Sequence, residues 1–185
     1  MDKQRAENAV RELLLALDQD VVSEGLRDTP QRVADMYIEQ CTEKDAEIDR
    51  VFSEEKYSGL VLVRNIPFVS MCSHHMVFFS GKVHIGYIPK KKVLGLSKLA
   101  RLVQSCSVGL TTQEHITAEI ADALYSNDDI SCLGVMVILC ASHGCMELRG
   151  VRAIGSSTVT SEVRGVFRDV PAARQELLSL IGSEL

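Results

Sequence analysis

Hydrophobic side chains recur at helical spacing through the first forty residues. Over residues 2–18, apolar positions fall every three or four residues between charged ones, which predicts an amphipathic helix. The Asp-Thr-Pro run at residues 28–30 predicts the start of a second helix, because Asp or Thr caps the first turn and Pro is tolerated there. That helix is expected to end near Gln40. Residues 42–58 are charged, contain Ser and Gly, and predict a linker or surface loop.

From Leu60 onward the pattern changes to runs rich in β-branched and aromatic residues, which predict strands. Two helical stretches interrupt these runs, and a third closes the chain. The order of helices, strands, two helices, strands and helix indicates an α+β fold with a mostly antiparallel sheet. We therefore expect an N-terminal helical region and linker over residues 1–58, and the domain that carries the chemistry over residues 59–185. The predicted strands are 60–63, 66–69, 77–88, 133–141 and 156–166, and the predicted helices are 97–107, 113–125 and 171–181.

The bulk composition limits the class of partner. With 185 residues, 46% hydrophobic and 24% charged, the chain suits one globular domain, or one domain with a helical extension. A net charge of −5 gives no overall positive field to attract nucleic acid or an anionic membrane. No apolar run approaches the ~20 residues of a membrane span, and residues 1–20 lack the features of a secretory signal. We expect a cytoplasmic protein with no nucleic-acid or membrane partner, in which local Lys and Arg clusters meet any anionic ligand.

Six cysteines would be enough for three disulfides. However, Cys106, Cys132 and Cys140 lie inside apolar runs, and nothing else in the sequence indicates an oxidising compartment. We therefore expect reduced thiols, two of them on a metal ion.

Two short clusters of thiols and imidazoles carry the most specific chemistry. Cys72 and His75 lie within one turn, and Cys145 follows about 70 residues later, after another apolar run. Together they supply three ligands of the kind that zinc prefers, and three protein ligands leave one position for water, as in catalytic zinc sites. A Cys-x-x-His pair alone is weak evidence, since a buried core cysteine or a core histidine is the alternative. The second cluster favours metal, and we predict a zinc hydrolase.

His74 and His143 each neighbour a proposed ligand without being needed as one. An imidazole beside an activated water can move protons near neutral pH, because its unperturbed pKa is about 6.5. The alternative is a supporting role, in which the ring orients a ligand or a carboxylate. We favour proton transfer for both.

A basic cluster opens the helix predicted over residues 97–107. Ser97 is a plausible N-cap, and Lys98 and Arg101 share one face of the first turn. A helix N-terminus offers free N–H groups and the positive end of the dipole, so two cations there predict a phosphate site. A solvated basic face is the alternative, but cations at this end oppose the dipole and cost stability unless an anion is present. Arg149 could join them, and so could Arg32 from a neighbouring subunit.

Glu114 has two interpretations as well. Thr111 and Glu114 fit the capping box, in which the carboxylate serves only the helix start. A carboxylate that accepts two N–H bonds is also what the edge of a guanine requires. The pattern alone leaves both interpretations open.

Taken together and in this order, these residues resemble those of the GTP cyclohydrolase I family, the first enzymes of folate and tetrahydropterin synthesis. The likeness covers nearly the whole chain, and the combination of motifs is very specific. The matching segments are Asp28-Thr29-Pro30-x-Arg32-Val33, Cys72-x-His74-His75, Gly81-x-x-His84-Ile85-Gly86-Tyr87-Ile88-Pro89, Gly95-Leu96-Ser97-Lys98-Leu99-Ala100-Arg101, Gln113-Glu114-x-Ile116-Thr117, His143-x-Cys145-Met146-x-x-Arg149-Gly150-Val151, Thr158-x-Thr160 and Gly165-x-Phe167.

The resemblance implies the tunnelling fold (T-fold), with a mostly antiparallel sheet, helices packed on one face and an N-terminal helical extension. It also implies a homodecamer of two stacked pentamers, with active sites at subunit interfaces. The implied substrate is GTP. Zinc-activated water attacks C8 of the guanine, formate leaves, the ribose rearranges, and ring closure gives 7,8-dihydroneopterin triphosphate.

The resemblance also assigns roles to individual residues. The implied site consists of Cys72, His75 and Cys145 for zinc; His74, His143 and Ser97 for catalysis; Gln113 and Glu114 for the guanine edge; and Lys98, Arg101, Arg149 and a neighbouring subunit's Arg32 for the triphosphate.

Two departures from the family pattern leave alternatives open. Ser73 stands where the family usually has Glu, and the stretch before Gln113 lacks the basic residues that are common there. One alternative is an enzyme of the same fold that acts on a different purine nucleotide. The other is a non-catalytic, zinc-stabilised homologue that binds nucleotide or regulates a partner.

Overall fold

The computed structural model describes residues 1–44, 51–52, 57–90, 92–127 and 130–182. The chain divides into two compact units, residues 1–42 and 43–185. The linker expected over residues 42–58 lies partly outside the described residues. The assignment of the chemistry to residues 59–185 stays a prediction.

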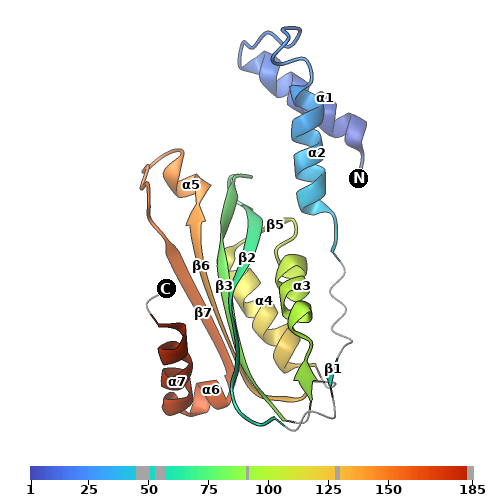
Figure 1. Ribbon diagram of the computed structural model, residues 1–185. Coiled ribbons are helices and arrows are strands. Elements are labelled where there is room, and N and C mark those ends of the chain that lie inside the picture. The colour runs from blue at the N-terminus through green and yellow to red at the C-terminus, as the bar shows by residue number, and fades with distance from the viewer. Residues whose placement is uncertain (45–50, 53–56, 91, 128–129, 183–185) are drawn as a thin grey trace. The chain divides into compact units, whose positions relative to one another are not determined.

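The first unit is a pair of helices, as the sequence pattern predicts (Figure 1). Helix α1 spans Lys3–Ala16 and α2 spans Thr29–Cys41, with Pro30 in the first turn of α2. An ion pair of 2.6 Å between Lys3 Nζ and Asp35 Oδ1 joins the two helices. Both predicted helices are therefore confirmed, including the start of the second.

A sheet forms the centre of the second unit. Its strands are β2 (Val61–Cys72), β3 (Phe78–Pro89), β5 (Leu110–Thr111), β6 (Cys132–His143) and β7 (Thr158–Gly165); a separate pair is formed by β1 (Val51–Phe52) and β4 (Val93–Leu94). Among the described residues, five strands lie in the order β5-β2-β3-β6-β7. Strands β2, β3, β6 and β7 pair antiparallel in succession, and β5 runs parallel beside β2. The predicted α+β class and mostly antiparallel sheet are confirmed.

Strand β2 is longer than either run that predicted it. The runs 60–63 and 66–69 belong to one strand, because the chain passes the intervening residues without leaving the sheet. The register with β3 shifts between Val63 and Ile66, and Asn65 takes a φ of 60° there. Asn tolerates this left-handed conformation better than most residues, so the irregularity redirects the strand and does not end it.

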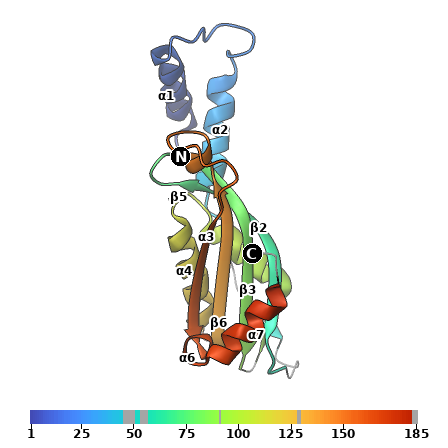
Figure 2. The same ribbon diagram turned by 90° about the vertical axis from the view of Figure 1, so that its left-hand side faces the viewer.

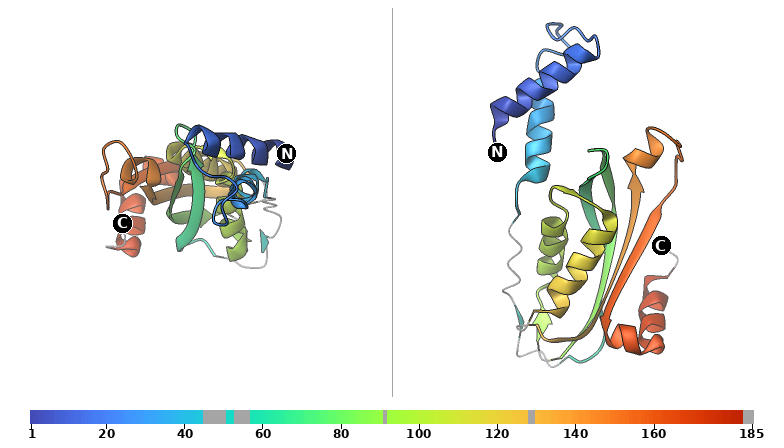
Figure 3. Two further views of the ribbon diagram at one scale, coloured as in Figure 1. Left: turned by 90° about the horizontal axis from the view of Figure 1, so that it is seen from above. Right: turned by 180° about the vertical axis from the view of Figure 1, so that it is seen from behind.

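Two helices cover one face of the sheet, and they lie across it in the view from behind (Figure 3). Helix α3 spans Leu96–Cys106 and α4 spans Gln113–Tyr125, each within one residue of its prediction. Alternate residues of the strands point toward these helices and form the larger core. Its fully buried members include Ile85, Tyr87, Leu99, Ile116, Ile120, Val137 and Leu139.

The expectation that the helices pack on one face is wrong for the C-terminal helices (Figure 2). Helix α6 (Val166–Asp169) and α7 (Pro171–Ile181) cover the opposite face, where Met136 and Ile138 join Phe167 in a second core. The reason lies in β6, whose central residues are buried on both sides. A strand that is apolar on both faces needs cover on each.

The two ends of the sheet carry different segments. At one end β2 finishes at Cys72, β3 begins, and Phe79 pairs with His143 at the end of β6. At the other end Pro89 pairs with Cys132, and the chain continues through β4 into α3. We name these the Cys72 end and the Pro89 end. Helix α3 starts at the Pro89 end and runs back toward β5, which pairs with β2 at the Cys72 end (Figure 1).

All six cysteines are free thiols. Burial raises the pKa of Cys106 to about 12 and that of Cys132 to about 12, so both stay protonated near neutral pH. These two thiols are therefore poor nucleophiles and poor metal ligands.

Over the ranges that the structure describes, no helix combines the length and the apolar character needed to cross a membrane. The expected cytoplasmic location stays a prediction.

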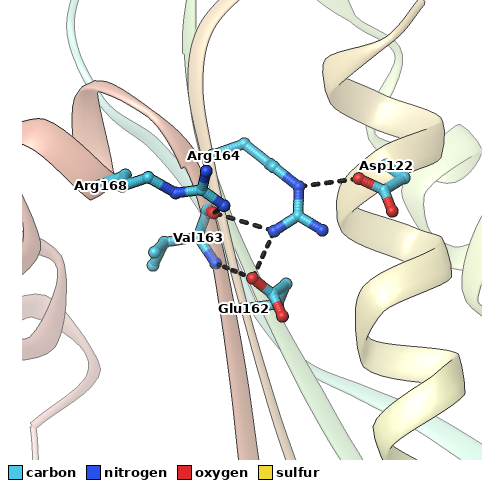
Figure 4. Close-up of polar contacts among 5 residues, drawn as sticks. All are labelled: Asp122, Glu162, Val163, Arg164 and Arg168. Atoms are coloured by element: carbon cyan, nitrogen blue, oxygen red, sulfur yellow. Dashed lines mark hydrogen bonds and ion pairs between the residues drawn. The ribbon is translucent and has the colours of Figure 1, made fainter.

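An arginine on β7 ties this strand to α4 (Figure 4). Arg164 Nε donates to Asp122 Oδ1 at 2.7 Å, and its Nη1 donates to Glu162 and to the carbonyl of Val163. The Arg164 side chain is 17% exposed, whereas that of Asp122 is 58% exposed. Because the guanidinium is the shielded member of the cluster, its removal loses charged hydrogen bonds that water replaces only in part.

Replacing Arg164 with Met should lower the free energy of unfolding by about 1–2 kcal/mol, since the carboxylates left behind stay partly solvated. Arg168→Ala is the control, because its guanidinium makes a long 3.4 Å bond to the Val163 carbonyl and its loss should cost less than about 0.5 kcal/mol. Urea unfolding followed by circular dichroism measures both. Equal losses from the two variants would show that the cluster does not stabilise this strand.

Candidate active site

The turn between β2 and β3 holds two of the predicted metal ligands. Cys72 is the last residue of β2, and its N–H donates to Val77 O at 3.0 Å. Its carbonyl accepts from the His75 N–H at 3.3 Å and from the Met76 N–H at 2.9 Å. Met76 takes a φ of 53°, which turns the chain sharply into β3. These bonds bring His75 back toward the Cys72 thiol.

The third ligand comes from the end of β6. His143 ends that strand opposite Phe79, and Cys145 lies in the short helix α5, Gly144–Glu147. Gly144 packs so closely on β3 that a Cβ there would lie 2.8 Å from the Phe78 carbonyl oxygen. A side chain at this position would push α5 away. The glycine therefore lets Cys145 approach the turn at the start of β3.

These two segments bring three ligand atoms together. The donor atoms of Cys72, His75 and Cys145 all lie within 4.8 Å of one another. Cys72 Sγ is 3.9 Å from His75 Nδ1. A sulfur and a nitrogen on one tetrahedral zinc ion would be roughly 3.6 Å apart. In the part of the chain that the structure describes, no fourth Cys, His, Asp or Glu joins this group. The donor set therefore fits a metal ion with an open coordination position.

The surroundings of the Cys145 thiol shift its pKa in the direction that a bound cation would oppose. Burial, and next to it the neighbouring Cys72, raises the pKa of the Cys145 thiol. A positive ion between the sulfurs would oppose this effect, because thiolates are the form that binds metal and the metal stabilises them.

Arg149 contacts the imidazole ligand. Its Nη1 lies 2.7 Å from His75 Nε2, and a guanidinium can only donate, so Nε2 accepts. In a neutral ring the other nitrogen, Nδ1, then carries the hydrogen and lies nearest to Cys72 Sγ. Metal binding through Nδ1 would leave the ring hydrogen on Nε2 and break this bond. Arg149 would then be available to an anion.

His143 is held on two sides. Its ring stacks on Phe79, with the centroids 4.6 Å apart and the planes 4° from parallel. Its Nε2 lies 2.7 Å from Gln113 Oε1. Burial lowers the pKa of the His143 imidazole, and Glu114 partly opposes this effect. The neutral ring is therefore favoured near pH 7.

Gln113 is buried, with 1% of its surface exposed. Its Nε2 donates to the carbonyls of Leu139 and Thr158 at 3.0 Å, and it lies 3.1 Å from Thr160 Oγ1. The amide hydrogens are thus engaged with β6 and β7. Gln113 also lines the pocket described below, and its predicted contact with a guanine edge stays a prediction.

A pocket of about 220 Å³ opens beside these residues, and its walls include Cys72, His74, Glu114, His143 and Cys145. The exposed His74 ring has its Nδ1 3.8 Å from Cys72 Sγ. The predicted proton carriers, two metal ligands and the predicted base-reading carboxylate therefore share one cavity at the Cys72 end of the sheet.

Glu114 lies on the pocket wall and is exposed. The predicted capping box is wrong, because Thr112, not Thr111, caps α4 by accepting from the His115 N–H at 3.3 Å. Glu114 is therefore one position away from the place where a capping box needs its carboxylate. The Ser73 N–H donates to Thr111 O at 3.0 Å, which ties this wall to the turn that holds Cys72 and His75.

Proteins of similar sequence establish the family. The family model described as GTP cyclohydrolase I matches residues 6–182. The chain belongs to the GTP cyclohydrolase I family of enzymes. The GTP cyclohydrolase 1 of Carboxydothermus hydrogenoformans is 45% identical over 100% of this chain and 97% of its own length. The GTP cyclohydrolase 1 of Bacillus subtilis is 48% identical over 98% of this chain and 96% of its own.

A solved structure of an archaeosine synthase QueF-Like in the apo form has 18% identity and a TM-score of 0.49. It covers 60% of this chain and 97% of its own, and it is too distant to support an argument about this fold.

Part of the predicted site of this GTP cyclohydrolase I chain lies away from the pocket. Ser97, Lys98 and Arg101 lie in the first turns of α3, at the Pro89 end of the sheet. The 11 residues of α3 span about 16 Å, and Ser97 and Lys98 lie in its first turn, at the end of the helix away from β5 (Figure 1). Gly95, not Ser97, is the N-cap, so that prediction is wrong. Arg32 lies on α2, in the other unit.

Two residues of the site were not predicted from the sequence. Phe79 stacks on His143, and Thr160 contacts the Gln113 amide. The alternation within the strand predicted over residues 77–88 could have placed Phe79 on the core face with Val83 and Ile85. The family motif Thr158-x-Thr160 was the available signal for the other.

The purified protein should bind about one divalent metal ion per chain, and Cys145→Ser should lower the affinity by more than about tenfold because it removes one of three ligands. Cys140→Ser is the matched control, since that thiol lies on β6 outside the ligand group and should leave metal content unchanged. Elemental analysis after dialysis against a competing chelator measures both. Equal metal retention by the two variants would remove Cys145 from the metal site.

Proposed function

We propose that this chain is a zinc-dependent GTP cyclohydrolase I. The observation that carries the proposal is the meeting of a three-ligand donor set with His143 and Glu114 around one pocket. Membership of the family supports GTP as the substrate. We assign catalysis to residues 59–185.

The proposed reaction converts GTP and water to formate and 7,8-dihydroneopterin triphosphate. Water adds at C8 of the guanine, and the C8–N9 bond breaks to leave a formamide. A second water releases formate from that formamide. The ribose then undergoes an Amadori rearrangement, and ring closure expels a water molecule. Every step moves protons among carbon, nitrogen and oxygen, and none requires an oxidant or a reductant.

Cys72, His75 and Cys145 would hold the zinc ion, which when bound supplies the Lewis-acid chemistry that makes water nucleophilic near neutral pH. His143 and His74 are the proposed proton carriers. The neutral state of His143, favoured by burial, and its place on the pocket wall support this role, because a neutral imidazole can accept a proton and return it to a leaving nitrogen.

Glu114 is the proposed reader of the guanine edge. Its two carboxylate oxygens match a pair of N–H donors on the base, and charge-assisted bonds of this kind are strong. Its exposure on the pocket wall supports the role.

We further propose the tunnelling fold and a homodecamer of two stacked pentamers, with active sites between chains. The supporting observation is that Ser97, Lys98 and Arg101 lie at the opposite end of the sheet from the metal ligands of their own chain. A neighbouring subunit would supply all three: Ser97 to the ribose, and Lys98 and Arg101 to the triphosphate. Arg149 and a neighbouring subunit's Arg32 would complete the triphosphate site. Strand β7 lies at an edge of the described sheet and offers main-chain groups for pairing between chains.

Metal-loaded protein incubated with GTP should release formate and form a pterin that fluoresces after oxidation. His143→Ala should lower kcat by about 100-fold or more, because it removes a proton carrier. His115→Ala is the matched control: this exposed imidazole lies 3.6 Å from Glu119 and outside the pocket, and its loss should change kcat by less than about twofold.

Parallel assays with deoxyGTP and ATP address the alternatives. Turnover of another purine nucleotide without turnover of GTP would favour an enzyme of different specificity. Nucleotide binding without any turnover would favour a non-catalytic homologue. Either result contradicts the proposed activity.

A subunit-mixing experiment tests the shared site. Lys98→Ala and Glu114→Ala should each be nearly inactive, because one loses a triphosphate contact and the other the base contact. Co-expressed in equal amounts, they should recover about a quarter of the wild-type activity, since a site shared by two chains receives both intact halves with roughly that chance. Glu114→Ala mixed with His143→Ala should not recover activity. If the Lys98→Ala and Glu114→Ala pair also recovered no activity, the two halves of the site would belong to one chain.

A further inference from the structure

The amide of Gln113 has a single possible orientation. Its Nε2 meets the main-chain carbonyls of Leu139 and Thr158, both at 3.0 Å. Carbonyl oxygens only accept hydrogen bonds, so a reversed amide would place its own oxygen against two others. Oε1 is therefore the atom that meets His143.

That orientation determines which nitrogen of His143 carries the hydrogen. Gln113 Oε1 can only accept, and it lies 2.7 Å from His143 Nε2, so Nε2 must donate. The neutral ring is then the Nε2–H tautomer, and Nδ1 holds the lone pair. The parallel ring of Phe79, at 4.6 Å, hinders rotation of the imidazole about its Cβ–Cγ bond, which would put Cε1 in the place of Nε2.

A closed ring of hydrogen bonds holds the Gln113 side chain in place. The amide Nε2 lies 3.1 Å from Thr160 Oγ1, which lies 2.6 Å from Thr117 Oγ1, and the Thr117 hydroxyl donates to Gln113 O at 2.7 Å. The directions agree if each hydroxyl accepts from the preceding group and donates to the next. The two amide hydrogens are then shared among three acceptors, the two carbonyls and Thr160 Oγ1. Gln113 and Thr117 are buried, where each unmade bond would be costly, so this network favours one arrangement.

We propose that Gln113 is a positioning residue that fixes His143 as the Nε2–H tautomer and reserves Nδ1 for proton transfer. This role differs from the contact with the guanine edge that the family resemblance implies. The kinetic part of the inference rests on the proposed function, whereas the tautomer can be measured without turnover.

The direct test is the tautomer of His143 in metal-loaded, full-length wild-type protein. Solid-state NMR of protein with isotopically labelled histidine, near pH 8.5 and well above the ordinary imidazole pKa of about 6.5, separates protonated from bare ring nitrogens. Comparison with His143→Asn assigns its signal among the five histidines. We expect hydrogen on Nε2 and none on Nδ1. Hydrogen on Nδ1 overturns the proposal.

Two variants separate positioning from packing. Gln113→Met keeps the side-chain length and removes both the amide oxygen and the amide nitrogen. It should give a mixture of His143 tautomers and lower kcat by about 10- to 100-fold, while KM for GTP changes by less than about twofold. Thr160→Val removes one acceptor of the amide and leaves the two carbonyls, so it should keep the Nε2–H tautomer.

The outcomes distinguish this inference from the proposed function. If Gln113 reads the base, Gln113→Met raises KM and leaves the tautomer unchanged, which overturns the inference. If Gln113→Met does not fold, the spectra of the wild type and of Thr160→Val still decide, because an Nδ1–H signal in either contradicts the proposal. An Nε2–H signal in metal-loaded protein that does not turn over GTP supports the inference and overturns the proposed function.

Discussion

The pairing of β3 with β6 is the constraint on which the candidate site depends. Its antiparallel register sets Phe79 opposite His143 and holds along nearly the whole length of both strands. Because side chains alternate between faces, a slip of one residue would turn His143 to the other face and carry Cys145 away from the turn that holds Cys72 and His75. Gly81 helps to specify this register, since a Cβ there would lie 1.9 Å from a main-chain oxygen of β6 and no side chain fits.

Local patterns were enough to predict most of the elements and to single out the three residues that the structure brings together as a possible metal site. Helix α4 begins and ends where its periodicity predicts, and so does α7. Cys72 and His75 lie within one turn, so their proximity follows from the chain itself. Cys145 is different, because only the pairing of β3 with β6 brings it close to Cys72 and His75. The sequence predicted that these three residues come together because zinc prefers such ligands, and not from any geometric pattern.

The features that the local sequence does not indicate depend on contacts between distant segments. Gln113 and Glu114 are adjacent polar residues at one helix start, yet the first is buried against β6 and β7 and the second is exposed on the pocket wall. Nothing in their local sequence indicates which of the two side chains is buried and which is exposed. The basic turn of α3 was correctly predicted as helical, but only the tertiary path of the chain shows that it starts at the Pro89 end. The burial of the second sheet face likewise depends on α7, which lies far along the sequence from the first strands of the sheet that it covers.

The proposed division of the site between two chains has a physical consequence for assembly. The metal ligands, His143 and Gln113 are built on strand ends and one helix start within a single chain, where rigid neighbours hold their geometry. Of the cations proposed for the triphosphate, Arg149 lies beside that cluster and Lys98 does not. In the proposed assembly, a highly charged nucleotide would have its base recognised by one chain and most of its charge neutralised by another. In this arrangement nucleotide binding and subunit association are linked, because a ligand that binds the complex more tightly than the separate chains stabilises the complex by that difference in binding free energy.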